Sequence, residues 1–191
     1  TSDPDMFVHT MGSISSTASR RGMPAAMSAS TSIARRCSVR SSSAAMPCSS
    51  ISVTLDDLYT DTTVRFDDTL TNRGSNPQEF EIIYHTNYGE PLLEKGSRFL
   101  APTRSVTPFD ERAVEELKDY RVYYAPTKGY GETVYCMELN AGADGRTTVM
   151  LQNADATRGV AMSYNVDSLP FFTLWKNTDV GEKGYVTGLE P

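Results

Sequence analysis

From residue 51 onward, apolar and polar positions alternate in short runs, which is typical of β-strands with one buried face. The first two runs lie at 52–58 and 62–70, and a more continuous apolar run follows at 80–84. Later runs of strand length lie at 132–139, 147–152, 159–166 and 171–175. Many short strands separated by turns favour one sheet packed on another. We therefore expect an all-β protein, built as an antiparallel β-sandwich.

Two stretches between the predicted strands break this alternation. Residues 96–110 are polar and contain two prolines, so we expect an irregular excursion there. Residues 110–117 begin with acidic side chains, which the helix dipole favours in a first turn, and they predict one short helix. Between the fourth and fifth runs, the pair Asp144-Gly145 is a strong hairpin signal. The pattern thus predicts a hairpin in the second half of the chain.

Residues 1–50 differ in character from the rest. They contain no Leu, Lys, Glu, Asn, Gln or Tyr and are rich in Ser, Ala, Met and Arg. No hydrophobic period persists, so this segment cannot bury enough apolar area to offset the entropy of ordering itself. We divide the chain into a low-complexity segment at 1–50, predicted to be poorly ordered, and a β-sandwich portion at 51–191. Two alternatives stay open for residues 1–50: an organelle transit peptide, and translation in a shifted reading frame.

Charge and cysteine content narrow the class of protein. The 191 residues carry a net charge of −6, which argues against nucleic acid or an anionic membrane as the main partner. No apolar run is long enough to span a bilayer. Cys37, Cys48 and Cys136 show no C-x-x-C spacing, so neither a disulfide framework nor a cysteine zinc site is indicated. An odd set of cysteines suits a reducing compartment, and we expect a cytoplasmic protein whose oligomeric state the sequence leaves open.

Candidate chemistry begins with His85, one of two histidines in the chain. It follows the apolar run at 80–84, and Asn87, Gly89 and Pro91 after it are residues that interrupt strand pairing. We therefore expect His85 at the exit of a strand. An imidazole held there suits proton transfer near neutral pH. The alternative is a structural histidine, hydrogen-bonded under a loop.

Two further stretches carry candidate residues. Trp175, the sole tryptophan, stands beside Lys176 and Asn177, and a flat aromatic face next to hydrogen-bonding groups suits a sugar ring. The alternative is a tryptophan that anchors the core, with Lys176 in solvent. Glu190 lies between Leu189 and Pro191 after a strand-like run. A carboxylate with such apolar neighbours is a candidate for a shifted pKa.

Several of these stretches resemble one known family. YHTNYGEPLL at 84–93, EKGSRFLAP at 94–102 and LWKNTDVGEKGYVTGLEP at 174–191 resemble the aldose 1-epimerase, or galactose mutarotase-like, superfamily, over about residues 61–191. The match is to a bacterial branch whose members are mostly of unassigned function. The resemblance implies a galactose mutarotase-like supersandwich, with a sugar-binding cleft on one curved sheet. It also implies that this chain is an incomplete part of that fold.

The resemblance implies roles for particular residues. His85 corresponds to the general acid on the ring oxygen, and Glu190 corresponds to the general base on the anomeric hydroxyl. No cofactor and no metal are implied, and the expected partner is a monosaccharide or a sugar derivative. We expect His85 and Glu190 to converge across a concave β-surface, with room for one hexose ring between them.

Other residues are expected to contact sugar hydroxyls. The stretch VHTMGSISSTA at 8–18 is similar to a family motif whose histidine lines the cleft, which implies that role for His9. The remaining candidates are Asn87, Trp175, Lys176 and Asp179. The function expected is interconversion of sugar anomers by acid–base ring opening. The alternatives are a carbohydrate-binding sandwich without turnover, and an inactive fragment of such a protein.

Overall fold

The computed structural model describes residues 8–10, 14–20, 34–38, 63–66, 69–71, 81–180 and 184–191. Before residue 82, Phe66 is the residue whose side-chain burial is described. The first strands are β1 (Val8–Thr10), β2 (Ile14–Arg20), β3 (Ala34–Ser38), β4 (Thr63–Phe66), β5 (Thr69–Thr71) and β6 (Glu81–Tyr88). They are followed by β7 (Arg98–Leu100), β8 (Thr103–Pro108), the helix α1 (Glu111–Glu115) and a 3₁₀ turn, η1 (Leu117–Asp119). The last strands are β9 (Thr133–Leu139), β10 (Arg146–Gln152), β11 (Arg158–Asn165), β12 (Phe172–Thr178) and β13 (Tyr185–Glu190).

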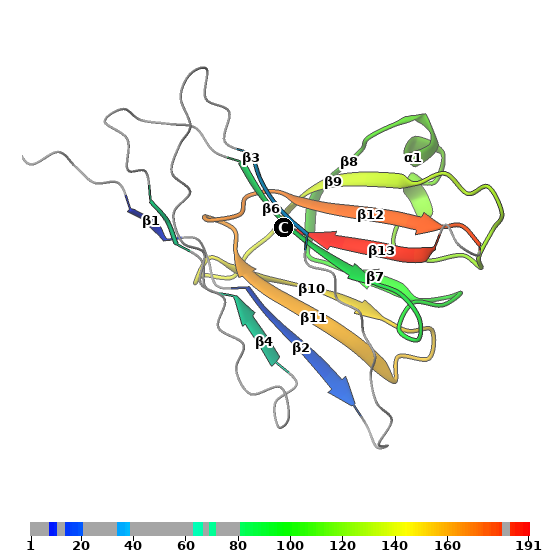
Figure 1. The fold of residues 1–191 in the computed structure, drawn as a ribbon, viewed down its shortest axis with the longest axis horizontal. Helices are drawn as coiled ribbons and strands as arrows, with labels where there is room; N and C mark the ends of the chain where they lie inside the picture. The colour runs from blue at the N-terminus through cyan, green and yellow to red at the C-terminus, as the bar shows by residue number, and fades with distance from the viewer. Residues whose placement is uncertain are drawn as a thin grey trace, which may run out of the picture.

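The strands form two main sheets. One has the order β4-β2-β11-β10-β7, the other has the order β3-β6-β13-β12-β9-β8, and β1 pairs with β5. Each strand pair in the described part of the chain is antiparallel. Figure 1 shows β9, β12 and β13 on one side of the molecule and β2, β10 and β11 on the other. The predicted all-β, antiparallel sandwich with one short helix is confirmed.

Aromatic side chains from the two sheets meet in the core. Phe172 on β12 stacks on Phe99 of β7, with ring centroids 5.6 Å apart, and on Tyr164 of β11 at 6.3 Å. Along β12 every second residue is buried, from Phe172 through Leu174 to Thr178. This alternation gives the six-stranded sheet one face toward the core and a second face that is free to carry a site.

The helix agrees with its predicted start. Asp110 is the N-cap, and its Oδ1 accepts a hydrogen bond from the Ala113 amide at 2.8 Å, which satisfies one of the unpaired amides of the first turn. Ala113 is fully buried against the sheet. No helix in the described residues is long and apolar enough to cross a membrane.

The predicted hairpin at Asp144-Gly145 is wrong. The residues do form a turn, with Gly145 at a φ of +75°, but β9 before it belongs to the six-stranded sheet and β10 after it to the five-stranded sheet. The chain therefore crosses between sheets at this point. The amide of Val166 donates to the Gly145 carbonyl, so the turn is held by the end of β11. A turn signal fixes the local backbone but does not decide which strands pair.

The predicted irregular stretch at 96–110 contains β7 and β8. β8 is the outermost described strand of the six-stranded sheet, and Pro108 is its last residue. β7 pairs with β10 on one side and is bridged to Val122 on the other. Proline is tolerated on an edge, because no neighbour there requires its missing amide hydrogen. Pro108 at the end of β8, and Pro102 between the two strands, thus concealed both strands from the pattern.

The first part of the chain contributes to all three sheets. β1, β2 and β3 lie within residues 1–50, where β2 pairs with β11 and β3 pairs with β6. The division of the chain at residue 50 stays a prediction. The run predicted at 62–70 is represented by β4 and β5, and the strand predicted at 52–58 lies outside the described residues.

Candidate active site

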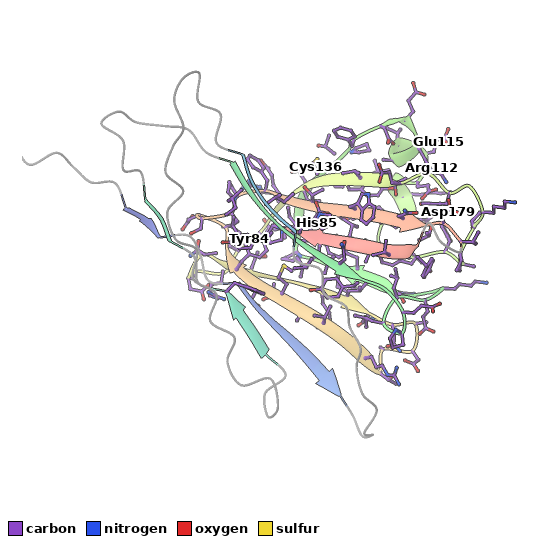
Figure 2. The ribbon with its side chains drawn as sticks, viewed as in Figure 1. Tyr84, His85, Arg112, Glu115, Cys136 and Asp179 are labelled. Carbon is purple, nitrogen blue, oxygen red and sulfur yellow. The ribbon has the colours of Figure 1, made fainter. Side chains whose placement is uncertain are left out.

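The register of β6 and β13 brings His85 and Glu190 together. Asn87 is paired with Gly188 and Thr86 with Leu189, so the next pair along these strands is His85 with Glu190. The amide of Tyr84 donates to the Pro191 carbonyl at 3.1 Å, which continues the pairing beyond them. The two residues that were proposed as acid and base are therefore neighbours on adjacent strands, and Figure 2 shows His85 beside β13.

His85 does not lie at a strand exit as predicted. It is an interior residue of β6, which continues through Asn87 to Tyr88. The interruption expected at Asn87 does not occur, because that residue remains paired with β13. His85 is consequently held by a continuous strand on each side of its backbone, with β13 on one side and β3 on the other.

The side chains of His85 and Glu190 are in direct contact. The distance from His85 Nδ1 to Glu190 Oε1 is 2.8 Å, with 30% of the His85 side chain exposed and 7% of the Glu190 side chain exposed. The expectation of a hexose ring between the two groups is therefore wrong, because directly opposed residues on neighbouring antiparallel strands leave their side chains adjacent. Of the two side chains, that of His85 is the one more exposed to solvent.

The contact has consequences for protonation. Burial raises the pKa of the Glu190 carboxyl, and the nearby His85 lowers it in part. His85 Nε2 lies 2.9 Å from Asn87 Oδ1, which accepts a hydrogen bond from Nε2–H. Nδ1 lies 2.8 Å from Glu190 Oε1, but this buried oxygen has no hydrogen-bond partner in the described structure, so the two groups are close without an aligned hydrogen bond.

Trp175 lies on the same face of the sheet. It is paired with Gly188, and its ring centroid is 6.0 Å from that of His85, with 47° between the ring planes. The indole Nε1–H donates to Glu132 Oε2 at 2.6 Å. This charge-assisted hydrogen bond fixes the orientation of the indole. The arrangement places an aromatic surface next to His85 and Glu190.

Lys176 lies on the opposite face of the same sheet. It is 1% exposed, and its Nζ donates to the carbonyls of Tyr120 at 3.2 Å and Val122 at 2.9 Å. Nζ also lies 4.9 Å from the centre of the Tyr123 ring. Burial lowers the pKa of this lysine to about 8. The structure therefore places Lys176 in the core beneath Trp175, and not beside His85 and Glu190.

Asp179 is also separate from the pair, and the role expected for His9 stays a prediction. Asp179 Oδ1 accepts hydrogen bonds from the amides of Gly129 at 3.0 Å and Val180 at 2.7 Å, and Figure 2 shows it at the far end of β12 from His85. It lines an open cleft of about 370 Å³, together with Glu90, Pro126, Val180 and Tyr185. His9 is in β1, paired with Leu70, and its side chain lies outside the description.

Two residues of this region were not anticipated from the sequence. Glu132 stands just before β9 and looks like an ordinary surface carboxylate, and only its hydrogen bond to the indole identifies it. Gly188 lies between Trp175 and Asn87 across three strands. A glycine inside a predicted strand is a usable signal of a close approach. Among the described residues, no group of three or more His, Cys, Asp or Glu side chains could hold a metal ion.

Known proteins match this chain in sequence and in fold. Residues 11–191 match a family model described as "Domain of unknown function (DUF4432)". The fold is similar to the crystal structure of a "putative aldose 1-epimerase" from Klebsiella pneumoniae subsp. pneumoniae MGH 78578, with 36% sequence identity and a TM-score of 0.64. That match covers 68% of this chain and 36% of the other, so this chain spans about a third of that protein's length. No curated protein matches. The resemblance predicted from the sequence is confirmed.

Proposed function

The chain belongs to the DUF4432 family, and from this membership and the arrangement of His85, Glu190 and Trp175 we propose that it binds a sugar and interconverts its anomers. The observation that carries the proposal is the 2.8 Å contact between His85 Nδ1 and Glu190 Oε1. The similarity to a protein described as a "putative aldose 1-epimerase" supports the class of ligand. Because that protein is much longer, its activity is here a proposal for this chain.

Adjacent acid and base groups suit this chemistry. Opening a pyranose removes a proton from the O1 hydroxyl and delivers one to the ring oxygen O5, and both oxygens are bonded to the same carbon, C1. The groups that exchange these protons must therefore lie close together. Glu190 accepts the O1 proton, and protonated His85 donates from Nε2 to O5. The C1–O5 bond breaks as the C1–O1 double bond forms.

Closure of the open-chain sugar returns both protons. O5 attacks the aldehyde carbon from either face, His85 takes back the O5 proton, and the Glu190 carboxyl protonates O1. Attack on the opposite face gives the other anomer. Protons are exchanged between the sugar and the pair without any net oxidation, so the reaction needs no electron carrier.

The surroundings of the pair support the binding of a ring. Asn87 Oδ1 accepts the hydrogen bond from Nε2–H of His85 in the structure. When a sugar is bound, its O5 replaces Asn87 Oδ1 as the acceptor. The Trp175 indole, held by Glu132, supplies an aromatic surface for the C–H groups of the ring. A sugar that lies over the pair on the solvent side can reach both contacts.

Equilibration of freshly dissolved α-glucose and α-galactose, followed by polarimetry, tests the proposal. We expect the protein to accelerate equilibration of at least one of them. Removal of a general acid or base typically costs about 10²–10⁴-fold, so His85→Ala and Glu190→Gln should each lose most of the acceleration. Glu138→Gln is a matched control, because Glu138 is a carboxylate on β9 that pairs with Arg104 and not with the site.

The outcomes separate the proposal from its alternatives. Equal rates with and without the wild-type protein, for a panel of aldoses, refute the enzymatic function. Sugar-dependent fluorescence of Trp175 without acceleration would indicate a binding module, and a non-cooperative melt would indicate an inactive fragment. We also propose a cytoplasmic location, because three cysteines without paired spacing suit a reducing compartment. Recovery of the protein in a membrane or secreted fraction of its source cells would contradict that location.

A further inference from the structure

Gly188 occupies the centre of the candidate site without being required by the backbone. It is an interior residue of β13, paired with Trp175 on one side and Asn87 on the other. The glycines with positive φ in the described chain are Gly96, Gly129, Gly145 and Gly184, so Gly188 has a backbone conformation that other residues also adopt. Glycine weakens a strand interior, since it contributes no side chain to packing. We therefore asked whether a side chain would fit at position 188.

The space above Gly188 is filled by the carboxylate of Glu190. Residues 188 and 190 are two apart on one strand, so they share a face of the sheet. A Cβ built on Gly188 would overlap Glu190 Oε1, and would lie 3.2 Å from Glu190 Cδ and 3.4 Å from Glu190 Cγ. The Glu190 side chain thus lies back along β13, over the Cα of Gly188. The oxygen that a Cβ would displace is the one that contacts His85.

We propose that Gly188 is a positioning residue. Because it has no Cβ, the Glu190 carboxylate can lie over its Cα and contact His85. Any other residue at 188 forces Glu190 into a different rotamer and separates Oε1 from Nδ1. The placement of Glu190 by Gly188 is inferred from these contacts alone, whereas its effect on catalysis rests on the proposed function. The contact between the proposed acid and the proposed base is then set by a residue that exchanges no proton itself.

Nitrogen NMR of the imidazole tests the positioning directly. The chain has two histidines, so comparison with His85→Ala assigns the signals of His85. Glu190→Ala gives the reference spectrum for a lost contact. We expect Gly188→Ala to shift the Nδ1 signal of His85 to that of Glu190→Ala. A Gly188→Ala spectrum that keeps the wild-type Nδ1 signal would overturn the proposal, whether or not the protein has activity.

Thermal melts of four proteins provide a second measurement. Gly188→Ala should change the Tm less favourably in the wild-type background than in the Glu190→Ala background, because the new methyl group overlaps Glu190 only in the former. In the Glu190→Ala background the same substitution should not lower the Tm, since the obstructing carboxylate is gone. An equal decrease in both backgrounds would show that the methyl group clashes with something else and would overturn the proposal. This comparison remains informative if Gly188→Ala alone folds poorly, because the double variant is expected to fold.

Activity measurements connect the geometry to the proposed reaction. Gly188→Ala should reduce the acceleration of anomer equilibration to the level of Glu190→Gln, while Gly89→Ala serves as the control. A Cβ on Gly89 would make a tight contact with the Tyr185 carbonyl oxygen, at 3.3 Å, and would meet neither His85 nor Glu190. This variant therefore reports the effect of a strained backbone contact alone and should retain most of the wild-type rate. If the wild-type protein has no activity, the proposed function fails while the NMR and Tm results still decide the role of Gly188. Full activity in Gly188→Ala, with an intact wild-type activity, would overturn the positioning role.

Discussion

The buried charge of Lys176 predicts a measurable pH dependence of stability. Its Nζ has two main-chain carbonyls as hydrogen-bond acceptors, and its side chain is almost completely buried. Burial lowers its pKa from 10.5 to about 8, against an opposing effect of the acidic side chains of Glu116 and Asp119. In the unfolded chain this lysine regains its ordinary pKa. Between pH 8 and pH 10.5 the unfolded state therefore binds more protons than the folded state.

The sign and size of the effect follow from this difference. When the unfolded state binds more protons, the free energy of unfolding rises with pH. Each pKa unit corresponds to about 1.4 kcal/mol, so the interval from 10.5 to about 8 corresponds to about 3 kcal/mol in total. About 2 kcal/mol of this is regained between pH 8 and pH 10. The cost of the buried charge is fully present below pH 8 and is relieved as the amine loses its proton.

Urea unfolding of the wild type and of Lys176→Met tests this directly. The sole tryptophan reports the transition, and both proteins are measured at constant ionic strength from pH 7 to pH 10. Methionine keeps the volume of the side chain but cannot titrate. The stability difference, wild type minus variant, should rise by about 2 kcal/mol between pH 8 and pH 10.

Other titrating groups are common to both proteins and cancel in the difference. The buried tyrosines act in the opposite direction: burial raises the pKa of Tyr135 to about 12, so the folded state keeps its protons longer and stability falls above about pH 10. A difference between wild type and variant that stays constant from pH 8 to pH 10 would refute the reasoning. It would show that Lys176 is solvated in the folded protein or uncharged at neutral pH.

Two further predictions concern the site. Because burial raises the pKa of Glu190, the folded state holds this proton to higher pH than the unfolded chain. Stability should therefore fall as pH rises from about 4.5 into the raised range. Glu190→Gln should abolish this fall in urea unfolding curves, and an unchanged pH profile would contradict the burial of the carboxyl. Trp175→Ala should weaken sugar binding by about 1 kcal/mol, or roughly fivefold in Kd, as measured by calorimetry. Equal affinity in the two proteins would exclude the indole as a contact.

The sequence predicted the strands well where one face is buried. The alternation in β9, β10, β11 and β12 corresponds to residues that alternate between core and surface. It failed for β7 and β8, the outermost described strands of the two sheets. β8 is mostly polar and ends in Pro108, and β7 is only three residues long and is bridged on its outer side to Val122. Hydrophobic period therefore reports burial on a face, and it is silent where a strand lies at the margin of a sheet.

The local sequence pattern could not predict which strands pair with each other. Asp144-Gly145 forms the turn that its residues favour, yet the strands on either side enter different sheets. For the site, the resemblance identified His85 and Glu190, but their direct contact depends on the register of β6 with β13. Lys176 illustrates the same limit: it is adjacent to Trp175 in sequence, and the period of two in a strand sends it to the other face.

The position of β13 has a consequence for how the protein is made. β13 lies between β6 and β12, and it follows both of them in the chain, so it joins two parts of the six-stranded sheet that are synthesised earlier. Until Glu190 leaves the ribosome, β6 and β12 each have an open edge, and open edges are templates for pairing with other chains. The nascent chain therefore carries two separate parts of the six-stranded sheet until β13 is synthesised and pairs with both.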